Sequence, residues 1–313
     1  MNDSVTLTGT ILIKASGLVG GTVNGGSFYG PTGTGLLTLS GAINADSAAT
    51  VALVRGGNVR VSTAGSATNW RNEGVLSLGG ANALNTGASL ALAGSNVASF
   101  DLNGFNQTLA GIGSSTGHNF AATITNSSTT AATLTLSTSA TTDYATVVSL
   151  LPLGSTGVNV LDANTVLAGN LSLQKQGTGT LQLQGPSTFT GNVIVSAGTL
   201  MTDRANNVNN PVNSCLGNPL VSRSITVENG ATLKLQQADV FGSATTVPAL
   251  TLVVNAGATV INNGNNFNTF GAIQLNGGTI STAGGAIAGY QSYNLLGTVS
   301  VGGTVASLSL IHI

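Results

Sequence analysis

Residues 192–200 read NVIVSAGTL, and four later stretches of the chain repeat this pattern. Each copy has two apolar residues at alternate positions, then a turn containing glycine, then threonine and a final apolar residue. Alternation with a period of two is typical of a strand with one buried face and one wet face. The other copies are SITVENGATL (224–233), TLVVNAGATV (251–260), AIQLNGGTI (272–280) and TVSVGGTV (298–305).

The spacing of the copies indicates a solenoid. Their final apolar residues lie at positions 200, 233, 260, 280 and 305, so the successive spacings are 33, 27, 20 and 25. A period of about 26 residues is typical of solenoids and propellers. We therefore predict that residues 1–313 form one all-β domain, a right-handed single-stranded parallel β-helix (β-solenoid) of roughly 12 coils. With coils about 4.8 Å apart, the rod would be about 60 Å long.

The turns of these copies also allow a competing fold. Asn229-Gly230 and Asn276-Gly277 stand between apolar runs, which is the strongest short signal for a β-hairpin. Hairpins would give an antiparallel sandwich or barrel, but the period is too long for simple hairpins. Aromatic residues make up only 4% of the chain, whereas an outer-membrane barrel carries aromatic girdles at both interfaces. Period and composition therefore favour the β-helix.

The composition excludes several classes of protein. Glycine accounts for 44 of 313 residues, about twice the usual share, and apolar residues form 42%, which is enough to build a core. Charged residues form only 5% of the chain, against about 25% in a typical domain. The 8 basic residues are scattered along the sequence, whereas a nucleic-acid binder needs clustered Lys and Arg. We therefore expect neither nucleic acid nor an anionic membrane surface to be a main partner.

Residues 175–200 read KQGTGTLQLQGPSTFTGNVIVSAGTL. This stretch resembles the autotransporter-associated β-strand repeat, through its Lys-x-Gly-x-Gly-Thr-Leu opening, its central Thr-Phe-Thr-Gly and its closing Gly-Thr-Leu. Residues 74–112 and 122–136 resemble segments common between such repeats. The resemblance covers most of residues 69–305, and the first sixty residues carry no clear copy.

The resemblance implies a β-helical passenger that is exported to the bacterial cell surface, with a C-terminal outer-membrane barrel or another anchor. Neither that barrel nor a signal peptide is present in these 313 residues. We expect both in the full-length protein. We also expect residues 308–313 to be a truncation or a foreign end, since a solenoid needs a polar cap.

No residue cluster in the sequence predicts catalysis, cofactor binding or a metal site. Asp143 and Asp162 are about one short coil apart in the sequence, so they could stack on neighbouring coils as an acid pair or a Ca²⁺ site, although each is more simply a turn residue. His118 and His312 have no Cys or His at ligand spacing. Cys215 is the only cysteine, and its simpler interpretation is an inert small residue.

Two segments are candidates for binding. Arg55, Arg60, Arg71 and Glu73 form the densest charged patch, which is either a solvated face or a contact for a partner. Trp70 lies within it and could stack on a sugar, although a core position fits tryptophan better. Residues 201–223 lack alternation and contain many turn formers, so we expect an excursion from the coil that is sensitive to proteases.

The favoured function is a structural and adhesive surface stalk that is not an enzyme. Its expected partners are glycans or proteins on host or neighbouring cells. The alternative is a β-helical enzyme, a lyase or hydrolase that processes polysaccharides, which would need clustered carboxylates on one face. Ice binding ranks third, because Thr-x-Thr pairs such as Thr123/Thr125 and Thr133/Thr135 do not recur at one fixed position of the copies.

Overall fold

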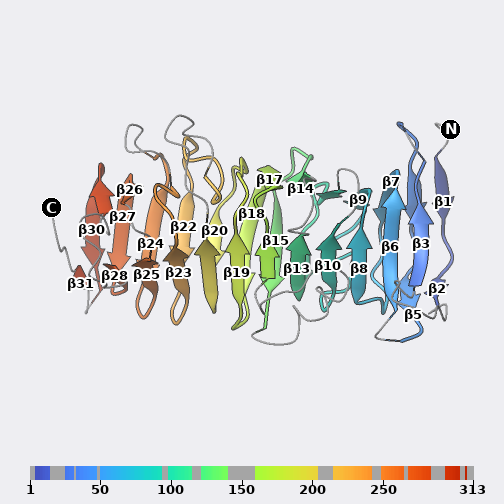
Figure 1. Cartoon of the computed structure of the whole chain (residues 1–313), viewed down its shortest axis with the longest axis horizontal. Coiled ribbons are helices and arrows are strands. Elements are labelled where there is room, and N and C mark those ends of the chain that lie inside the picture. The colour runs from blue at the N-terminus through green and yellow to red at the C-terminus, as the bar shows by residue number, and fades with distance from the viewer. Residues whose placement is uncertain are drawn as a thin grey trace.

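The computed structural model is a rod of stacked parallel strands, with the two chain ends at opposite ends of its long axis (Figure 1). It describes residues 4–14, 25–31, 33–47, 50–93, 98–114, 121–139, 159–203, 214–241, 248–263, 267–282, 293–303 and 307–308. Within these ranges the chain is all-β and contains no helix. The predicted β-solenoid is therefore confirmed as a fold class.

Four sheets run along the rod. The first contains β1 (Val5–Leu7), β4 (Leu37–Leu39), β7 (Asn58–Val61), β9 (Val75–Leu78), β11 (Ala98–Asp101), β14 (Ala122–Asn126) and β17 (Thr165–Gly169). The second contains β3 (Gly25–Tyr29), β6 (Val51–Gly56), β8 (Asn69–Asn72), β10 (Ser89–Leu92) and β13 (Gly111–Ser114). The third contains β12 (Gln107–Leu109), β15 (Ala132–Ser137), β18 (Leu171–Gln176), β20 (Val193–Val195), β22 (Ser224–Val227), β24 (Thr251–Asn255), β27 (Ala272–Asn276) and β30 (Val299–Gly302). The fourth contains β16 (Asn159–Leu161), β19 (Thr180–Leu183), β21 (Thr199–Thr202), β23 (Thr232–Leu235), β25 (Thr259–Asn262), β28 (Thr279–Thr282) and β31 (Ser307–Leu308).

Two short sheets complete the rod, β2 (Ile11–Ile13) with β5 (Ile43–Ala45) and β26 (Asn268–Phe270) with β29 (Tyr293–Leu295). Hydrogen bonds between the sheets join them into three faces, which we name after their first strands. The β1 face runs from β1 to β17 and continues toward β26 and β29. Between these sheets, the Phe189 amide donates to the Leu167 carbonyl and the Asn218 amide donates to the Phe189 carbonyl.

The other two faces are built in the same way. The β2 face begins with β2 and β5. Its next coils are joined by backbone hydrogen bonds, in which the Ala67 amide donates to the Ile43 carbonyl and the Ala110 amide donates to the Ala88 carbonyl. From there the face continues through the sheet from β12 to β30. On the β3 face, β13 packs against β16, with the Ile112 amide donating to Asn159 Oδ1 over 2.9 Å. A single coil therefore places one strand on each face in turn, as the consecutive strands β17, β18 and β19 do.

Every pair of described strands is parallel, and this excludes the hairpin fold for the described residues. The one antiparallel contact among them is an isolated bridge between Asn255 and Gly277. The turn glycines instead carry the chain from the β2 face to the β3 face. Gly198, Gly230 and Gly257 occupy equivalent turns with φ of +64°, +75° and +74°. In this left-handed region only glycine is free of a Cβ clash, which explains the Asn-Gly and Ala-Gly pairs of the repeat.

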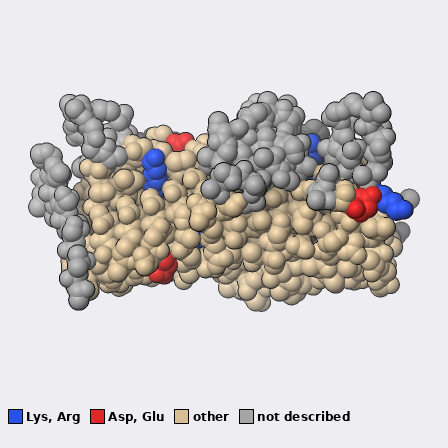
Figure 2. All heavy atoms as spheres, turned by 90° about the horizontal axis from the view of Figure 1, so that it is seen from below, with Lys and Arg blue, Asp and Glu red and all other residues tan. Residues whose placement is uncertain are grey.

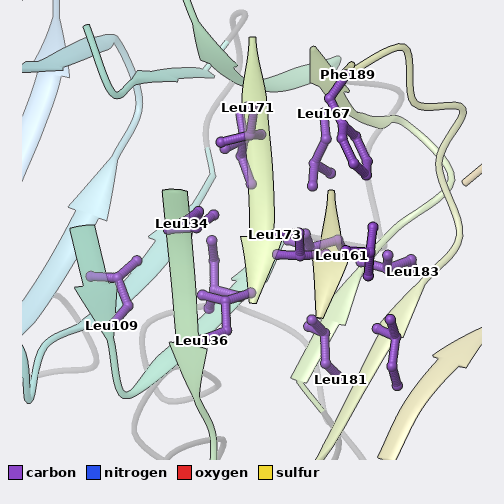
Figure 3. Close-up of a cluster of buried hydrophobic side chains, with 14 of the residues drawn as sticks. Leu109, Leu134, Leu136, Leu161, Leu167, Leu171, Leu173, Leu181, Leu183 and Phe189 are labelled. Carbon is purple, nitrogen blue, oxygen red and sulfur yellow. The ribbon is translucent and has the colours of Figure 1, made fainter. Parts of the chain in front are cut away.

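The register confirms the apolar rows that the repeats predict. On the β3 face, Leu181, Leu200, Leu233, Val260 and Ile280 lie in one row, each paired with the next. On the β2 face, Val193, Ile225, Leu252, Ile273 and Val299 do the same. The described members of both rows point inward. Figure 3 shows part of the resulting core, where leucines from neighbouring coils meet.

The sequence prediction for the residue that follows Ile280 in the row of the β3 face is wrong. Ile280 pairs with Leu308 and not with Val305, which lies outside the described residues. The connection that follows β30 is therefore longer than the copy at 298–305 suggests, and the row continues to Leu308. The number of about 12 coils and the hand of the coil stay predictions.

The expected alternation of buried and wet positions fails on the β3 face near the N-terminal end. In β8, Trp70 points inward in one row with Ala52 and Leu90. The next row, which contains Leu53 and Ala91, points outward and is nevertheless 2% and 0% exposed. These strands are therefore buried on both sides, unlike those of residues 180–282.

Candidate functional surfaces

The outer side of the β3 face carries a row of threonines, one from each of five successive coils. Register pairing places each threonine against the next. The row, which we call the threonine row, consists of Thr180, Thr199, Thr232, Thr259 and Thr279. Neighbouring hydroxyl groups are separated by about one strand spacing of 4.8 Å. The repeat pattern predicts these threonines, because each copy carries one directly before its final apolar residue and stacked copies present them along the rod.

A second outward row lies two residues further along each strand. It is chemically mixed and consists of Gln182, Met201, Lys234, Ile261 and Ser281. The face therefore has no regular Thr-x-Thr array. The pairs noted in the sequence are on different faces, since Thr123 and Thr125 lie in β14 on the β1 face and Thr133 and Thr135 lie in β15 on the β2 face.

Charged side chains are sparse on the flank of the rod. In Figure 2, the few blue and red groups are separated by other residues, except for one red and one blue group that lie side by side near one end. On the β2 face, polar side chains bond from coil to coil: Asn276 donates to Asn255 Oδ1 over 3.1 Å, and Asn255 donates to the Glu228 carboxylate over 2.8 Å. The flank thus offers polar groups, most of them uncharged, from one coil to the next.

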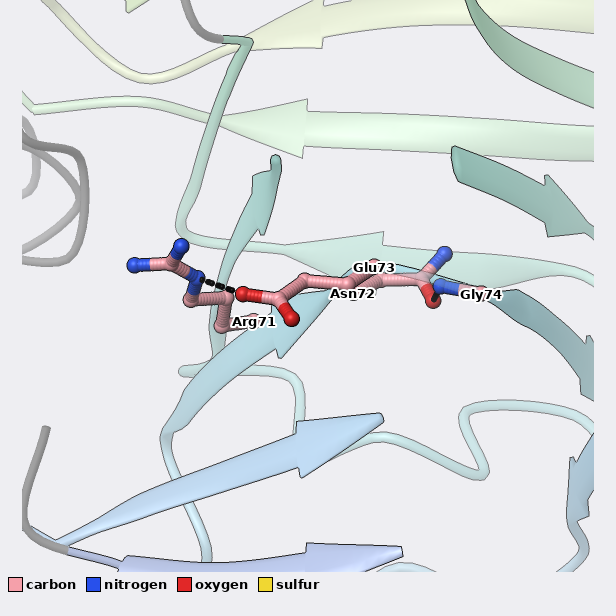
Figure 4. Close-up of polar contacts among 4 residues, drawn as sticks. All are labelled: Arg71, Asn72, Glu73 and Gly74. Carbon is pink, nitrogen blue, oxygen red and sulfur yellow. Dashed lines mark hydrogen bonds and ion pairs between the residues drawn. The ribbon is translucent and has the colours of Figure 1, made fainter. Parts of the chain in front are cut away.

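The predicted charged patch is only partly assembled. Arg71 Nε and Glu73 Oε1 form an ion pair of 2.7 Å at the end of β8 (Figure 4). Arg55 is an exposed residue of β6 on the same face. Arg60 lies in β7 on the β1 face. The four residues close in sequence are therefore divided between two faces. Trp70 is 2% exposed and its Nε1 donates to the carbonyl of Ala67 over 3.2 Å, so it is a core residue and not a sugar-stacking platform.

The candidate acid pair cannot be placed, because Asp143 lies outside the described residues. Asp162 is buried in the turn before β17, where it accepts hydrogen bonds from the Asn164 amide and from Thr165 Oγ1, at 3.2 and 2.8 Å. That is the local turn role that short acidic residues often have. Within the described ranges, no group of three His, Cys, Asp or Glu side chains could hold a metal ion. His118 and His312 lie outside those ranges.

Both ends of the excursion expected over residues 201–223 belong to the coil. Met201 and Thr202 belong to β21, and residues 214–223 pack against the coil, while 204–213 lie outside the described residues. Arg223 secures the returning segment. Its guanidinium donates to the carbonyls of Leu216, Asn218 and Gly191 and lies 5.2 Å from the Phe189 ring centre. Burial lowers the pKa of Arg223 to about 10, so it stays charged at neutral pH.

Cys215 belongs to this returning segment. It is fully buried in the apolar core, with an exposed fraction of 0%. Thiol reactivity requires a thiolate that a reagent can reach. The position therefore agrees with the interpretation of Cys215 as a small core residue.

Lys175 is a functional residue of the fold that sequence reasoning missed. It stands in the inward row between Leu136 and Val195, and it is fully buried. Its Nζ donates to the carbonyls of Gln176, Gly177 and Ala197 at 2.7, 2.8 and 3.2 Å. The ammonium thereby joins the turns of two successive coils, while its stem fills the row. The signal was present in the sequence, because Lys175 continues the alternation of Leu171 and Leu173.

We expect Lys175→Met to lower the free energy of unfolding by about 2 kcal/mol, because Gly177 and Ala197 lose a donor while the apolar stem is retained. Chemical denaturation followed by circular dichroism measures this difference. Lys234→Met is the matched control, since Lys234 points outward from β23. Equal stability of the two variants would contradict the role of Lys175 as a clamp between turns.

The difference in stability between the wild type and Lys175→Met should depend on pH. Burial lowers the pKa of Lys175 to about 8 from its ordinary value of 10.5. Between these values the unfolded chain holds a proton that the folded chain has lost, so folding gains stability at this site as the pH rises from 8 to 10.5. The stability of the wild type relative to Lys175→Met should therefore increase across that interval, and a constant difference would show that the amine does not titrate there.

Residues 173–201 match the family model described as the passenger-associated-transport-repeat. The matched stretch runs from β18 to β21 and includes Lys175 and the turn glycines Gly177 and Gly198. The chain therefore carries an autotransporter passenger repeat, at the place where the sequence pattern predicts one. No curated protein and no solved structure matches the chain. The described part of the chain has no helix suited to spanning a membrane.

Proposed function

We propose that the chain is a structural and adhesive stalk, the passenger region of an exported autotransporter-like protein at the bacterial cell surface. The observation that carries the proposal is the passenger repeat at 173–201, embedded in an uninterrupted inward row from Leu181 to Ile280. In such a solenoid each coil contacts only its neighbours, so repetition extends the rod without changing its cross-section. This is the geometry that a spacer between a cell and a binding partner requires.

The flank supports the adhesive part of the proposal. Hydroxyl and amide groups recur along the threonine row and the Glu228–Asn255–Asn276 ladder, with few charges among them. A single hydroxyl or amide contributes little to binding, but many weak contacts on one rigid body add to useful avidity. The proposed partners are glycans or proteins on host or neighbouring cells. The 8 basic residues of the chain remain too few and too scattered to favour nucleic acid.

Adhesion is tested with beads that carry the chain at high or low density, applied to a glycan array and to intact bacterial cells. We expect retention that rises steeply with density and falls when Thr199, Thr232 and Thr259 are all replaced by alanine. The control replaces the buried threonines Thr165, Thr202 and Thr269 by alanine, one at a time. The stability of each control variant is measured, so that loss of a surface contact can be told from loss of folding. Absence of binding at every density would refute the adhesive role and leave the stalk role in place.

We also propose that the chain does not turn over polysaccharides. Acid–base cleavage of a sugar bond needs two ionisable groups held close together, with one pKa displaced. Among the described carboxylates, Glu73 pairs with Arg71, Asp162 caps a turn, and Asp203 accepts hydrogen bonds from Gln182 and Gln237. Assays for reducing sugar and unsaturated uronate over pectins, alginates and glucans should show no product. Activity that disappears in Asp143→Asn or Asp162→Asn would favour the enzyme instead.

A further inference from the structure

We infer that Met201 is a modification site, at which the folded chain takes up one oxygen atom from a peroxide, reversibly and mainly on one side of its sulfur. The inference rests on the outward position of Met201 in the middle of the rod and on the hydrogen bond that Gln236 donates to its sulfur. It does not depend on the proposed adhesive function.

Met201 lies on the outer side of the β3 face. In β21, Leu200 points into the core, whereas Met201 points outward between Gln182 of the preceding coil and Lys234 of the next. The side chain of Met201 is half-buried. An oxidant in the solvent can therefore reach its sulfur without any coil having to open.

The other sulfur atoms of the chain are placed differently. The sequence contains two methionines and one cysteine. Cys215 is fully buried in the core, and Met1 lies outside the described residues. Within the part of the chain that the structure describes, Met201 therefore carries the one sulfur that faces solvent.

A hydrogen bond restrains this sulfur. Gln236 Nε2 donates to Met201 Sδ over 3.1 Å. The carboxamide of Gln236 is itself oriented, because its Oε1 accepts a hydrogen bond from Asn263 Nδ2 over 2.6 Å. A thioether sulfur is a weak acceptor with two lone pairs. Gln236 occupies one of them, so an oxidant meets the other.

The reaction is the transfer of one oxygen atom. The free lone pair of the sulfur attacks one oxygen of hydrogen peroxide, and the bond between the two peroxide oxygens breaks. The attacked oxygen stays on the sulfur as a sulfoxide, and its proton passes to the departing hydroxide, which becomes water. The sulfur loses two electrons and the peroxide gains them. The sulfoxide is chiral, and two classes of reductase each reduce one of its epimers.

The surroundings of Met201 suit the oxidised side chain. A sulfoxide disrupts an apolar core, because it replaces an apolar group by a polar one. On the β3 face the neighbours are polar, since Gln182 and Lys234 stand beside Met201 in the same outward row and Gln236 contacts the sulfur. The coil should therefore keep its fold when Met201 is oxidised.

The test treats the folded chain with hydrogen peroxide, then denatures and digests it with trypsin. Cleavage after Lys175 and Arg204 gives a peptide, 176–204, with Met201 as its only methionine. Mass spectrometry finds the added oxygen, and each reductase is applied to a separate portion. We expect Met201 to be oxidised with an unchanged circular dichroism spectrum and denaturation midpoint. One epimer should exceed the other roughly fivefold, in keeping with the net strength of one hydrogen bond.

Two variants show whether Gln236 directs the oxygen. Gln236→Leu removes the donor from a half-buried position, and its two epimers should form in nearly equal amounts, as in the wild type oxidised in urea. Gln182→Leu is the matched control, because Gln182 Nε2 donates to Asp203 Oδ2 over 2.7 Å and not to the sulfur. This variant should keep the preference of the wild type.

Four outcomes would overturn the inference. Oxidation of Met201 in urea but not in the folded chain would show that its sulfur is out of reach. Unfolding on oxidation would make the sulfoxide a lesion. Equal amounts of the two epimers in the folded wild type would show that the hydrogen bond does not direct the reaction. The same preference in Gln236→Leu, or its loss in Gln182→Leu, would refute the role of Gln236.

Discussion

Leu233→Asp should abolish cooperative folding of the rod or lower its free energy of unfolding by more than about 5 kcal/mol, one of the largest effects expected of a single substitution. Leu233 is fully buried between Leu200 and Val260 in the inward row of the β3 face. The change removes apolar contacts with both neighbouring coils and places an unpaired carboxylate in the core. Urea denaturation monitored by circular dichroism gives the size of the loss.

Lys234→Asp is the matched control, because the same residue is introduced one position further along β23, where the side chain points outward. Its effect should stay within about 0.5 kcal/mol. If Leu233→Asp leaves no folded protein, Leu233→Ala provides a measurable loss of about 3 kcal/mol. Similar, small shifts of the denaturation midpoint for Leu233→Asp and Lys234→Asp would be incompatible with a buried row.

Gly198→Ala should destabilise the chain by about 3 kcal/mol, through strain in the turn between β20 and β21. Gly198 has φ of +64°, which disfavours any side chain. An added Cβ would also lie 2.5 Å from the carbonyl oxygens of both Gly177 and Gly179 in the preceding coil. Backbone atoms cannot move aside as the end of a flexible side chain can, so the two coils would have to separate.

Gly230→Ala separates the two causes, because Gly230 occupies the same turn one coil later. Its φ is +75°, but an added Cβ meets nothing within 4 Å. Gly230→Ala should therefore lower the free energy of unfolding only by the cost of a side chain in the left-handed conformation, about 1 kcal/mol. Thermal and urea unfolding of the two variants measure both values. If Gly230→Ala costs as much as Gly198→Ala, the close approach of successive turns contributes nothing.

The sequence predicted the part of the fold in which the pattern repeats. Between Leu181 and Ile280 each inward residue has a copy in the next coil, so period and alternation together determine its position. The first sixty residues contain no clear copy, and their strands could not be placed in the same way. The burial of Leu53 and Ala91 on the outer side of their strands could not be predicted either. Alternation shows which residues of a strand point inward, but it does not show what covers the outward ones.

The candidate sites were predicted less well, for a related reason. Closeness in sequence does not mean closeness on a solenoid, where each strand passes to another face. Arg60 and Arg71 therefore lie on different faces, although they belong to successive strands of the chain. In contrast, Thr180 and Thr279 lie on one row although several coils of chain separate them. Lys175 was overlooked because a charged residue is rarely assigned to a core, and only its hydrogen bonds to turn carbonyls explain its burial.

The direction of the strands determines how the rod responds to tension. Strands cross the long axis (Figure 1), so the hydrogen bonds between coils point along it. A pull along this axis therefore separates the coils one ladder at a time. The coil from Thr180 to Thr199 would release about 60 Å of extended chain, at roughly 3.3 Å per residue. A surface attachment built on this rod would lengthen in steps, and each step would dissipate energy and limit the peak force on the attachment.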